Sequence, residues 1–277
     1  MIFVFIFILG FIEKTDGLFN SKYNPMRRLF IGFSLVLLLF SCSHSLYVHQ
    51  ISAANVLVKQ ENTIDDSLIQ AVIQPYRDSI EHDMSKLVGV SESPLKRGKP
   101  ESKLTNLVSD LLLETGIEYC QSSNLPVRPQ ASYVNYGGLR GSLPQGEITV
   151  GHLFELMPFE NEVVIIQLSG ESVQKMADKI AARGGEGVAG ITMGIQNEKV
   201  VDFKIGGQEI DPAKTYWMVT SDYIACGGDQ MSMFLNPADM ISTKLKLRDV
   251  LISGLKDRYK RDGIISVKED GRIFNVQ

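Results

Sequence analysis

The sequence has 277 residues, of which 44% are hydrophobic and 22% are charged, an ordinary composition for a globular protein. The formal net charge is −4 at pH 7, so no strongly basic surface indicates a nucleic-acid partner. The length suffices for one large domain or two small ones, and for a core that needs no disulfide or metal to be stable.

The beginning of the sequence is typical of an export signal. The opening stretch "MIFVFIFILGF" is apolar but short, and a second apolar stretch follows two arginines that come directly after Met26. A basic start, a short apolar region and a small residue before a cut are the parts of a signal peptide. The second stretch ends in "LFSC", which resembles a bacterial lipobox with Cys42 as its cysteine. We therefore expect a signal segment over residues 1–41, translation from Met26, and a lipid on Cys42.

The expected mature protein is an exported lipoprotein, anchored at the outer membrane or the periplasmic face. Ser43, directly after Cys42, gives no acidic signal for retention in the inner membrane. The alternative is a membrane anchor made of both apolar stretches, although neither alone reaches the roughly 20 residues of a spanning helix. Residues 42–62 are polar and mixed, and are expected to form a tether.

The first element of the folded part is predicted to be a helix after Thr63. Thr63 with Asp66 three residues later is typical of an N-terminal cap. Pro75 is expected to kink this helix or to split it in two. Apolar residues at helical spacing are Leu68, Val72, Ile73, Tyr76, Ile80, Met84 and Leu87. The following "VGVSES" predicts a strand.

A second helix is predicted over residues 102–119, with an apolar face that recurs at helical spacing. The next elements are a strand in "ASYVNYGG", a short helix in "TVGHLFELMPF" capped by Thr149, and a strand in "EVVIIQLSG". "GESVQKMADKIAARGG" predicts a helix that its glycines end.

The last third of the sequence predicts mostly strands. "KVVDFKIGGQEIDPAKTYWMVTSDYIA" gives two or three strands, a helix follows near residues 243–259, and the tail gives a strand pair around Asp270 and Gly271. Strands and helices alternate irregularly, which favours an α+β fold over a regular parallel α/β fold. We expect one such domain over residues 63–277.

Residues for hydrolytic chemistry are scarce. The sequence has only four histidines, no pair of them has metal-ligand spacing, and it contains neither a G-x-S-x-G elbow nor a P-loop. His152 lies near a glycine pair, where a lone histidine is more often a surface residue than a ligand contact. We expect no catalytic residue, no metal site and no cofactor in this chain. We expect Cys120 and Cys226 to be free, although an exported protein could pair them.

Two glycine pairs are each accompanied by groups that suit a binding site. The first, Gly137–Gly138, lies between Asn135 and Arg140, and the second, Gly227–Gly228, lies between Tyr223 and Asp229. Phe159, after a proline, falls between the two pairs in sequence.

Such groups match a nucleoside. Two aromatic faces can hold a flat ring, an arginine suits phosphate or carboxylate oxygens, and carboxylate or amide groups suit hydroxyls and ring nitrogens. Glycine lets backbone approach a ligand closely. The alternative is two ordinary turns, with Phe159 in the core and Asp229 capping a turn.

Longer segments resemble the C-terminal, substrate-binding domain of the 5′-nucleotidase family. They are "NYGGLRGSLPQGEITVGHLFELMPFENEVVIIQLSGESV", "DPAKTYWMVTSDYIACGGDQMSMF" and "SKLTNLVSDLLLE", and the similarity runs from about residue 64 to the end. The resemblance implies layered sheets and helices. It implies that Phe159 and Tyr223 stack on a base, that Asn135 and Asp229 hydrogen-bond base or ribose, and that Arg140 meets an anionic group.

The sequence departs from the family pattern at several places. Tyr136 stands where many members have glycine, and Gln230 stands where the second signature has glycine. Pro100 falls near the position of a basic residue in members that cleave nucleotides, with Lys96, Arg97 and Lys99 close by. The phosphate end of the pocket therefore departs from the pattern, while the stacking end matches it.

The dimetal phosphoesterase domain with which typical members begin has no counterpart in this sequence. One hypothesis is a split 5′-nucleotidase, in which this chain binds the nucleotide and a separate metallophosphoesterase chain supplies the divalent metals. The other hypotheses are a non-catalytic nucleoside-binding surface lipoprotein, and an anchored domain whose pocket has decayed.

Overall fold

The computed structural model describes residues 32, 48, 51–53, 55 and 66–276. The chain divides into two units, Met1–Ile64 and Asp65–Gln277, and only the second is described almost throughout. The predictions on Met26, Cys42 and Thr63 fall outside the described residues. None of the helices in the described part combines the length and the apolar character that crossing a membrane requires.

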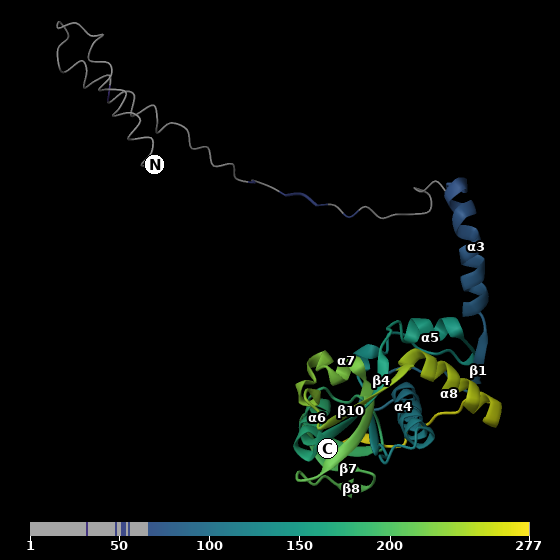
Figure 1. Ribbon diagram of the computed structural model, residues 1–277. Coiled ribbons are helices and arrows are strands. Elements are labelled where there is room, and N and C mark those ends of the chain that lie inside the picture. The colour runs from purple at the N-terminus through teal and green to yellow at the C-terminus, as the bar shows by residue number, and fades with distance from the viewer. Residues whose placement is uncertain (1–31, 33–47, 49–50, 54, 56–65, 277) are drawn as a thin grey trace, which may run out of the picture. The chain divides into compact units, whose positions relative to one another are not determined.

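The second unit mixes helices and strands (Figure 1). Its α-helices are α3 (Ser67–Met84), α4 (Lys103–Ser122), α5 (Val150–Leu156), α6 (Gly170–Ala182), α7 (Asp222–Ala225) and α8 (Leu247–Asp262). Its strands are β1 (Leu87–Ser91), β2 (Ala131–Val134), β3 (Gly146–Thr149), β4 (Glu162–Ser169), β5 (Gly187–Ala189), β6 (Ile191–Gln196), β7 (Lys199–Ile205), β8 (Gln208–Glu209), β9 (Thr215–Ser221), β10 (Asp239–Lys246) and β11 (Ile273–Asn275). Short 3₁₀ turns are η2 (Tyr136–Gly138), η3 (Gly228–Gln230) and η4 (Ser232–Phe234).

A five-stranded sheet in the order β10-β4-β9-β2-β5 forms the centre of this unit. Strand β4 is a continuous apolar run, and successive side chains of a strand point to opposite sides, so both of its faces are apolar. Val163 and Ile165 join one hydrophobic core, and Val164, Ile166 and Leu168 join another. The sheet is therefore covered on both faces.

Each core brings different elements onto the sheet. The first core joins one face of the sheet to α4, α5 and α8, and the second joins the other face to α6 and a four-stranded sheet in the order β11-β6-β7-β8. A two-stranded sheet pairs β1 with β3. These layers confirm the predicted α+β fold.

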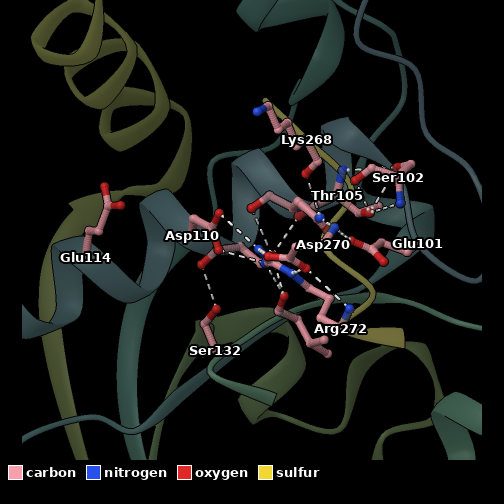
Figure 2. A network of polar contacts seen from close by, with 12 residues as sticks. Glu101, Ser102, Thr105, Asp110, Glu114, Ser132, Lys268, Asp270 and Arg272 are labelled. Atoms are coloured by element: carbon pink, nitrogen blue, oxygen red, sulfur yellow. Dashed lines mark hydrogen bonds and ion pairs between the residues drawn. The ribbon is translucent and has the colours of Figure 1, made fainter. Parts of the chain in front are cut away.

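The C-terminal tail differs from its prediction. The strand pair expected around Asp270 and Gly271 is wrong, because the carboxylate of Glu101 accepts both of their backbone N–H groups, at 2.7 and 2.9 Å. Arg272 then donates to Asp110 on α4 at 2.7 Å (Figure 2). Only β11 is a strand here, and it lies parallel to β6. Side chains of the α4 region therefore fix the path of the tail.

The helix predicted over residues 243–259 begins later than expected. Residues 239–246 form β10, which pairs with β4, and the helix α8 starts at Leu247. The Thr243 hydroxyl donates to the Val163 carbonyl at 2.7 Å, which ties this segment to the sheet. The open edge of β4 gives this segment backbone partners that outweigh its local helix preference.

Helix α3 also differs from its prediction. It is one helix with Pro75 inside it, so the alternative of two separate helices is wrong. The N-cap of the helix is Asp66, whose carboxylate accepts the N–H groups of Leu68 and Ile69. Proline has no N–H, so one carbonyl group of the preceding turn has no hydrogen-bond partner within the helix. None of the described residues of α3 is buried, so water can reach that carbonyl group.

Candidate functional site

The predicted binding residues lie at one edge of the central sheet. Strands β2 and β9 are parallel neighbours, and β4 runs antiparallel to β9, with Val163 opposite Ser221. The ends of β2 and β9 therefore lie beside the start of β4. Two turns meet the segment that precedes β4 at this edge. One directly follows β2, and the other follows β9 and the short helix α7. We call them the first turn (residues 135–138) and the second turn (residues 227–230).

A cavity of about 250 Å³ lies at this edge. Its size is close to the lower end of small-molecule sites. It is lined by Asn135, Gly137, Gly138, Arg140, Phe159, Asn161, Tyr223 and Asp229. The structure thus brings seven of the nine predicted site residues to one cavity. The other two, Gly227 and Gly228, shape the second turn behind it.

Asn161 is a lining residue that the sequence analysis does not include among the site residues. It follows Phe159 by two positions, directly before β4, and it lies within the first of the segments that resemble the family, as the last residue of "PFEN". The signal for it is therefore present in the sequence.

The first turn positions an amide and a guanidinium. Asn135 Nδ2 donates to Asp229 Oδ2 at 3.2 Å, which joins the first turn to the second. Gly138 leaves room for this amide, because a Cβ at that position would lie 2.7 Å from Asn135 Oδ1. The guanidinium of Arg140 lies 5.3 Å from the centre of the Phe159 ring, within the range of a cation–π contact.

The second turn holds Tyr223 and Asp229 in a fixed relation. The Asp229 N–H donates to the Tyr223 hydroxyl at 3.0 Å. Gly227 and Asp229 have left-handed backbone, with φ of 79° and 53°. A Cβ on Gly228 would lie 2.4 Å from the Tyr223 carbonyl oxygen, so only glycine fits against this tyrosine. Tyr223 is 48% exposed, which leaves much of its side chain open to a ligand.

The basic residues near Pro100 do not line the cavity. Arg97 and Lys99 lie over the ring of Tyr136, at 4.7 and 5.0 Å from its centre. Arg97 also donates to the Leu139 carbonyl at 2.7 Å. These two cations therefore contact the ring of Tyr136 and not the cavity. Among the lining residues, Arg140 is the one with a positive charge.

His152 serves the start of α5 and does not line the cavity. Its Nδ1 accepts the Thr149 N–H at 3.1 Å as part of a capping box. Cys120 is buried and Cys226 is exposed, and both are free thiols. Burial raises the pKa of Cys120 above its usual value.

In the part of the chain that the structure describes, no three His, Cys, Asp or Glu side chains gather as metal ligands. The described residues therefore do not fit a dimetal centre of the kind that phosphoesterases use. What the lining residues offer is stacking, hydrogen bonding and one positive charge. This arrangement can hold a flat, polar molecule.

Comparison with known proteins identifies the family. The family described as "5'-nucleotidase, C-terminal domain" matches residues 87–236. The chain belongs to this family. Its relatives include Protein UshA of Salmonella pullorum, 32% identical over 112 residues, which are 39% of this chain and 20% of that protein. A 5'-nucleotidase-related protein of Glossina morsitans morsitans is 26% identical over 234 residues, which are 76% of this chain and 41% of that protein.

Solved structures agree with this fold. A 5'-nucleotidase precursor from Thermus thermophilus aligns with a TM-score of 0.64 at 22% identity, over 78% of this chain and 44% of that one. A putative 5'-nucleotidase from Staphylococcus aureus aligns with a TM-score of 0.60 at 15% identity, over 80% of this chain and 46% of that one. The chain spans less than half the length of these relatives.

Proposed function

We propose that the cavity between the two turns binds a nucleoside or nucleotide, and that this chain is the binding half of a split 5′-nucleotidase. The observation that carries the proposal is that two aromatic side chains, Phe159 and Tyr223, line one cavity together with Asn135, Asp229 and Arg140. The aromatic rings suit a base, since every base has a π-face. Membership of the 5′-nucleotidase C-terminal family supports the same ligand class.

Each polar group of the cavity has a counterpart on such a ligand. An ionised Asp229 accepts hydrogen bonds only, so it suits the hydroxyls of a ribose or the N–H groups of a base. The amides of Asn135 and Asn161 can both donate and accept. Arg140 can meet a phosphate oxygen. The cavity would thus hold the base by stacking and the remaining groups by hydrogen bonds.

The chemistry of phosphate release would come from another chain. The described residues lack the donor set of a dimetal centre, and the printed sequence lacks the phosphoesterase motifs. In this proposal a separate, exported metallophosphoesterase supplies the metals and the nucleophile, and this chain, as a lipoprotein, holds the nucleotide near the membrane. Positioning of this kind contributes strongly to rate.

Ligand binding can be tested by calorimetry on the full chain with a panel of nucleosides and nucleotides. Tyr223→Ala should weaken binding about fivefold or more, because stacking contributes roughly 1–3 kcal/mol per base, or about fivefold to 150-fold in affinity. Tyr76→Ala removes another exposed tyrosine, from α3, far along the chain from the cavity, and should bind like wild type. Binding by Tyr223→Ala at wild-type affinity would contradict the assigned pocket.

The split arrangement requires a second experiment. A metallophosphoesterase chain that lacks this domain is mixed with the protein, and phosphate release from common nucleotides is measured with and without divalent metal. The mixture should release phosphate, and each chain alone should be nearly inert. A mixture that stays inert while nucleosides still bind would identify the protein as a stand-alone nucleoside-binding lipoprotein.

A further inference from the structure

An ion pair between a half-buried arginine and a buried glutamate lies behind the cavity and contacts both turns. Its members are Arg183, the C-cap of α6, and Glu186, three residues further on. Arg183 Nη1 lies 3.2 Å from Glu186 Oε1, and the side chain of Glu186 is 4% exposed. Neither residue lines the cavity. Any effect of the pair on a ligand must therefore pass through its contacts with the two turns.

Arg183 contacts the second turn at two atoms of one residue. Its Nη1 lies 3.4 Å from Asp229 Oδ2, and its Nη2 donates to the Asp229 carbonyl at 2.5 Å. The planar guanidinium presents several N–H groups in a fixed geometry, so it can hold a side chain and a backbone group at once. The hydrogen bond from Arg183 to the Asp229 carbonyl thus helps to hold Asp229 in its left-handed backbone conformation.

Glu186 contacts the first turn. Its Oε2 accepts the Tyr136 N–H, the first backbone donor after Asn135. Burial raises the pKa of Glu186, while the Tyr136 N–H and the Arg183 guanidinium act in the opposite direction. A buried carboxylate without these partners would be costly. The pair therefore links the backbone of the first turn to that of the second.

The contacts leave one oxygen of Asp229 for a ligand. Asp229 Oδ2 accepts the hydrogen bond from Asn135 and forms the ion pair with Arg183. Among the described residues none donates to Oδ1. We propose that Arg183 and Glu186 are positioning residues, which fix the separation of the two turns and present Asp229 Oδ1 to a hydrogen-bond donor of the bound nucleoside. This inference rests on the proposed function, because it takes the cavity to be the nucleoside site.

The structural alternative is that the pair only stabilises the fold. A buried ion pair is weak evidence of net stabilisation, since desolvation offsets the attraction. A structural role would lower stability and leave the affinity of the folded fraction unchanged. A positioning role would lower affinity through Asp229. A double-mutant cycle separates the two.

The test uses the full chain, calorimetry with the tightest-binding nucleoside of the panel, and thermal unfolding. Arg183→Lys keeps the charge but loses the fork, and should weaken binding about tenfold, the effect expected from a lost hydrogen bond to a charged group. Asp229→Asn should weaken binding as well. The double variant should bind no worse than Asp229→Asn alone, because Arg183 acts through Asp229.

Two further comparisons make the test specific. Glu186→Ala should weaken binding, and Glu186→Gln, which keeps an acceptor for the Tyr136 N–H, should recover most of the affinity. Arg258→Lys alters a matched ion pair with Glu114, on α8 and α4, and should leave binding unchanged.

The outcomes separate the two proposals. No binding of any nucleoside by the wild-type chain would overturn the proposed function, and this inference with it. Wild-type binding together with full affinity in Arg183→Lys, or losses that add in the double variant, would overturn the positioning role alone.

Discussion

The two turns at the cavity share a Gly-Gly pair but use it in different ways. In the second turn Gly227 has a φ of 79°, and Gly228 presses against the backbone and ring of Tyr223. In the first turn, Gly138 makes room only for the side chain of Asn135, and a Cβ on Gly137 would meet its nearest atom at 3.8 Å. In the second turn the need for glycine comes from the backbone, whereas in the first turn it comes from a single side chain.

This difference indicates which turn sets the geometry of the site. A clash with backbone cannot be relieved without moving the chain, whereas an amide side chain can rotate. The second turn also carries Asp229, whose backbone N–H donates to the Tyr223 hydroxyl and so ties the backbone of this turn to the tyrosine. We therefore expect glycine substitutions to have graded effects, from severe in the second turn to slight in the first.

The largest effect is expected for Gly228→Ala. The new methyl group would lie 2.4 Å from the Tyr223 carbonyl oxygen and 2.6 Å from two atoms of its ring. Overpacking of this kind costs about 1–3 kcal/mol, and the displaced ring should lose most of its affinity for a nucleoside. Denaturant unfolding measures the stability, and calorimetry measures the affinity. A variant with wild-type values in both would show that the second turn is not rigid.

A smaller effect is expected for Gly138→Ala. The methyl group would displace the Asn135 amide and break its 3.2 Å bond to Asp229. A single intramolecular hydrogen bond typically contributes about 0.5–1.5 kcal/mol, so binding should weaken roughly threefold to tenfold while stability changes little. Asn135→Ala should have a similar effect by itself. If the two substitutions combined additively, the methyl group would be acting on something other than this amide.

The sequence could predict much of this site because its signals are local. Each turn follows a strand and carries its binding groups within a few residues of its glycines, so motif and position suffice. Arg183 and Glu186 could not be found in this way. They lie about fifty residues from the first turn and more than forty from the second, and only the tertiary fold brings them behind the cavity.

Helices α3 and α4 show the same limit for the fold. Both have apolar residues at helical spacing, and the prediction of a helix is confirmed for both. Helix α4 buries ten residues, whereas in the described residues α3 buries none, and Leu68 is 79% exposed. Periodicity predicts a helix and its apolar side, but the partner of that side is a tertiary property. The late start of α8 has the same cause, since residues 239–246 form a strand that pairs with the edge of β4.

The smallest effect is expected for Gly137→Ala, which serves as the matched control for Gly138→Ala. The new methyl group would lie 3.8 Å from Asn135 Nδ2, an ordinary contact, and Gly137 does not have the left-handed backbone that disfavours alanine. Exposed substitutions of this kind usually change stability by less than about 0.5 kcal/mol. Gly137 lines the cavity, so its methyl group also measures how closely the ligand approaches the first turn. Unchanged affinity would place the ligand against the second turn and away from Gly137. A loss as large as that of Gly228→Ala would show that both turns hold the ligand equally closely, and would contradict the graded comparison.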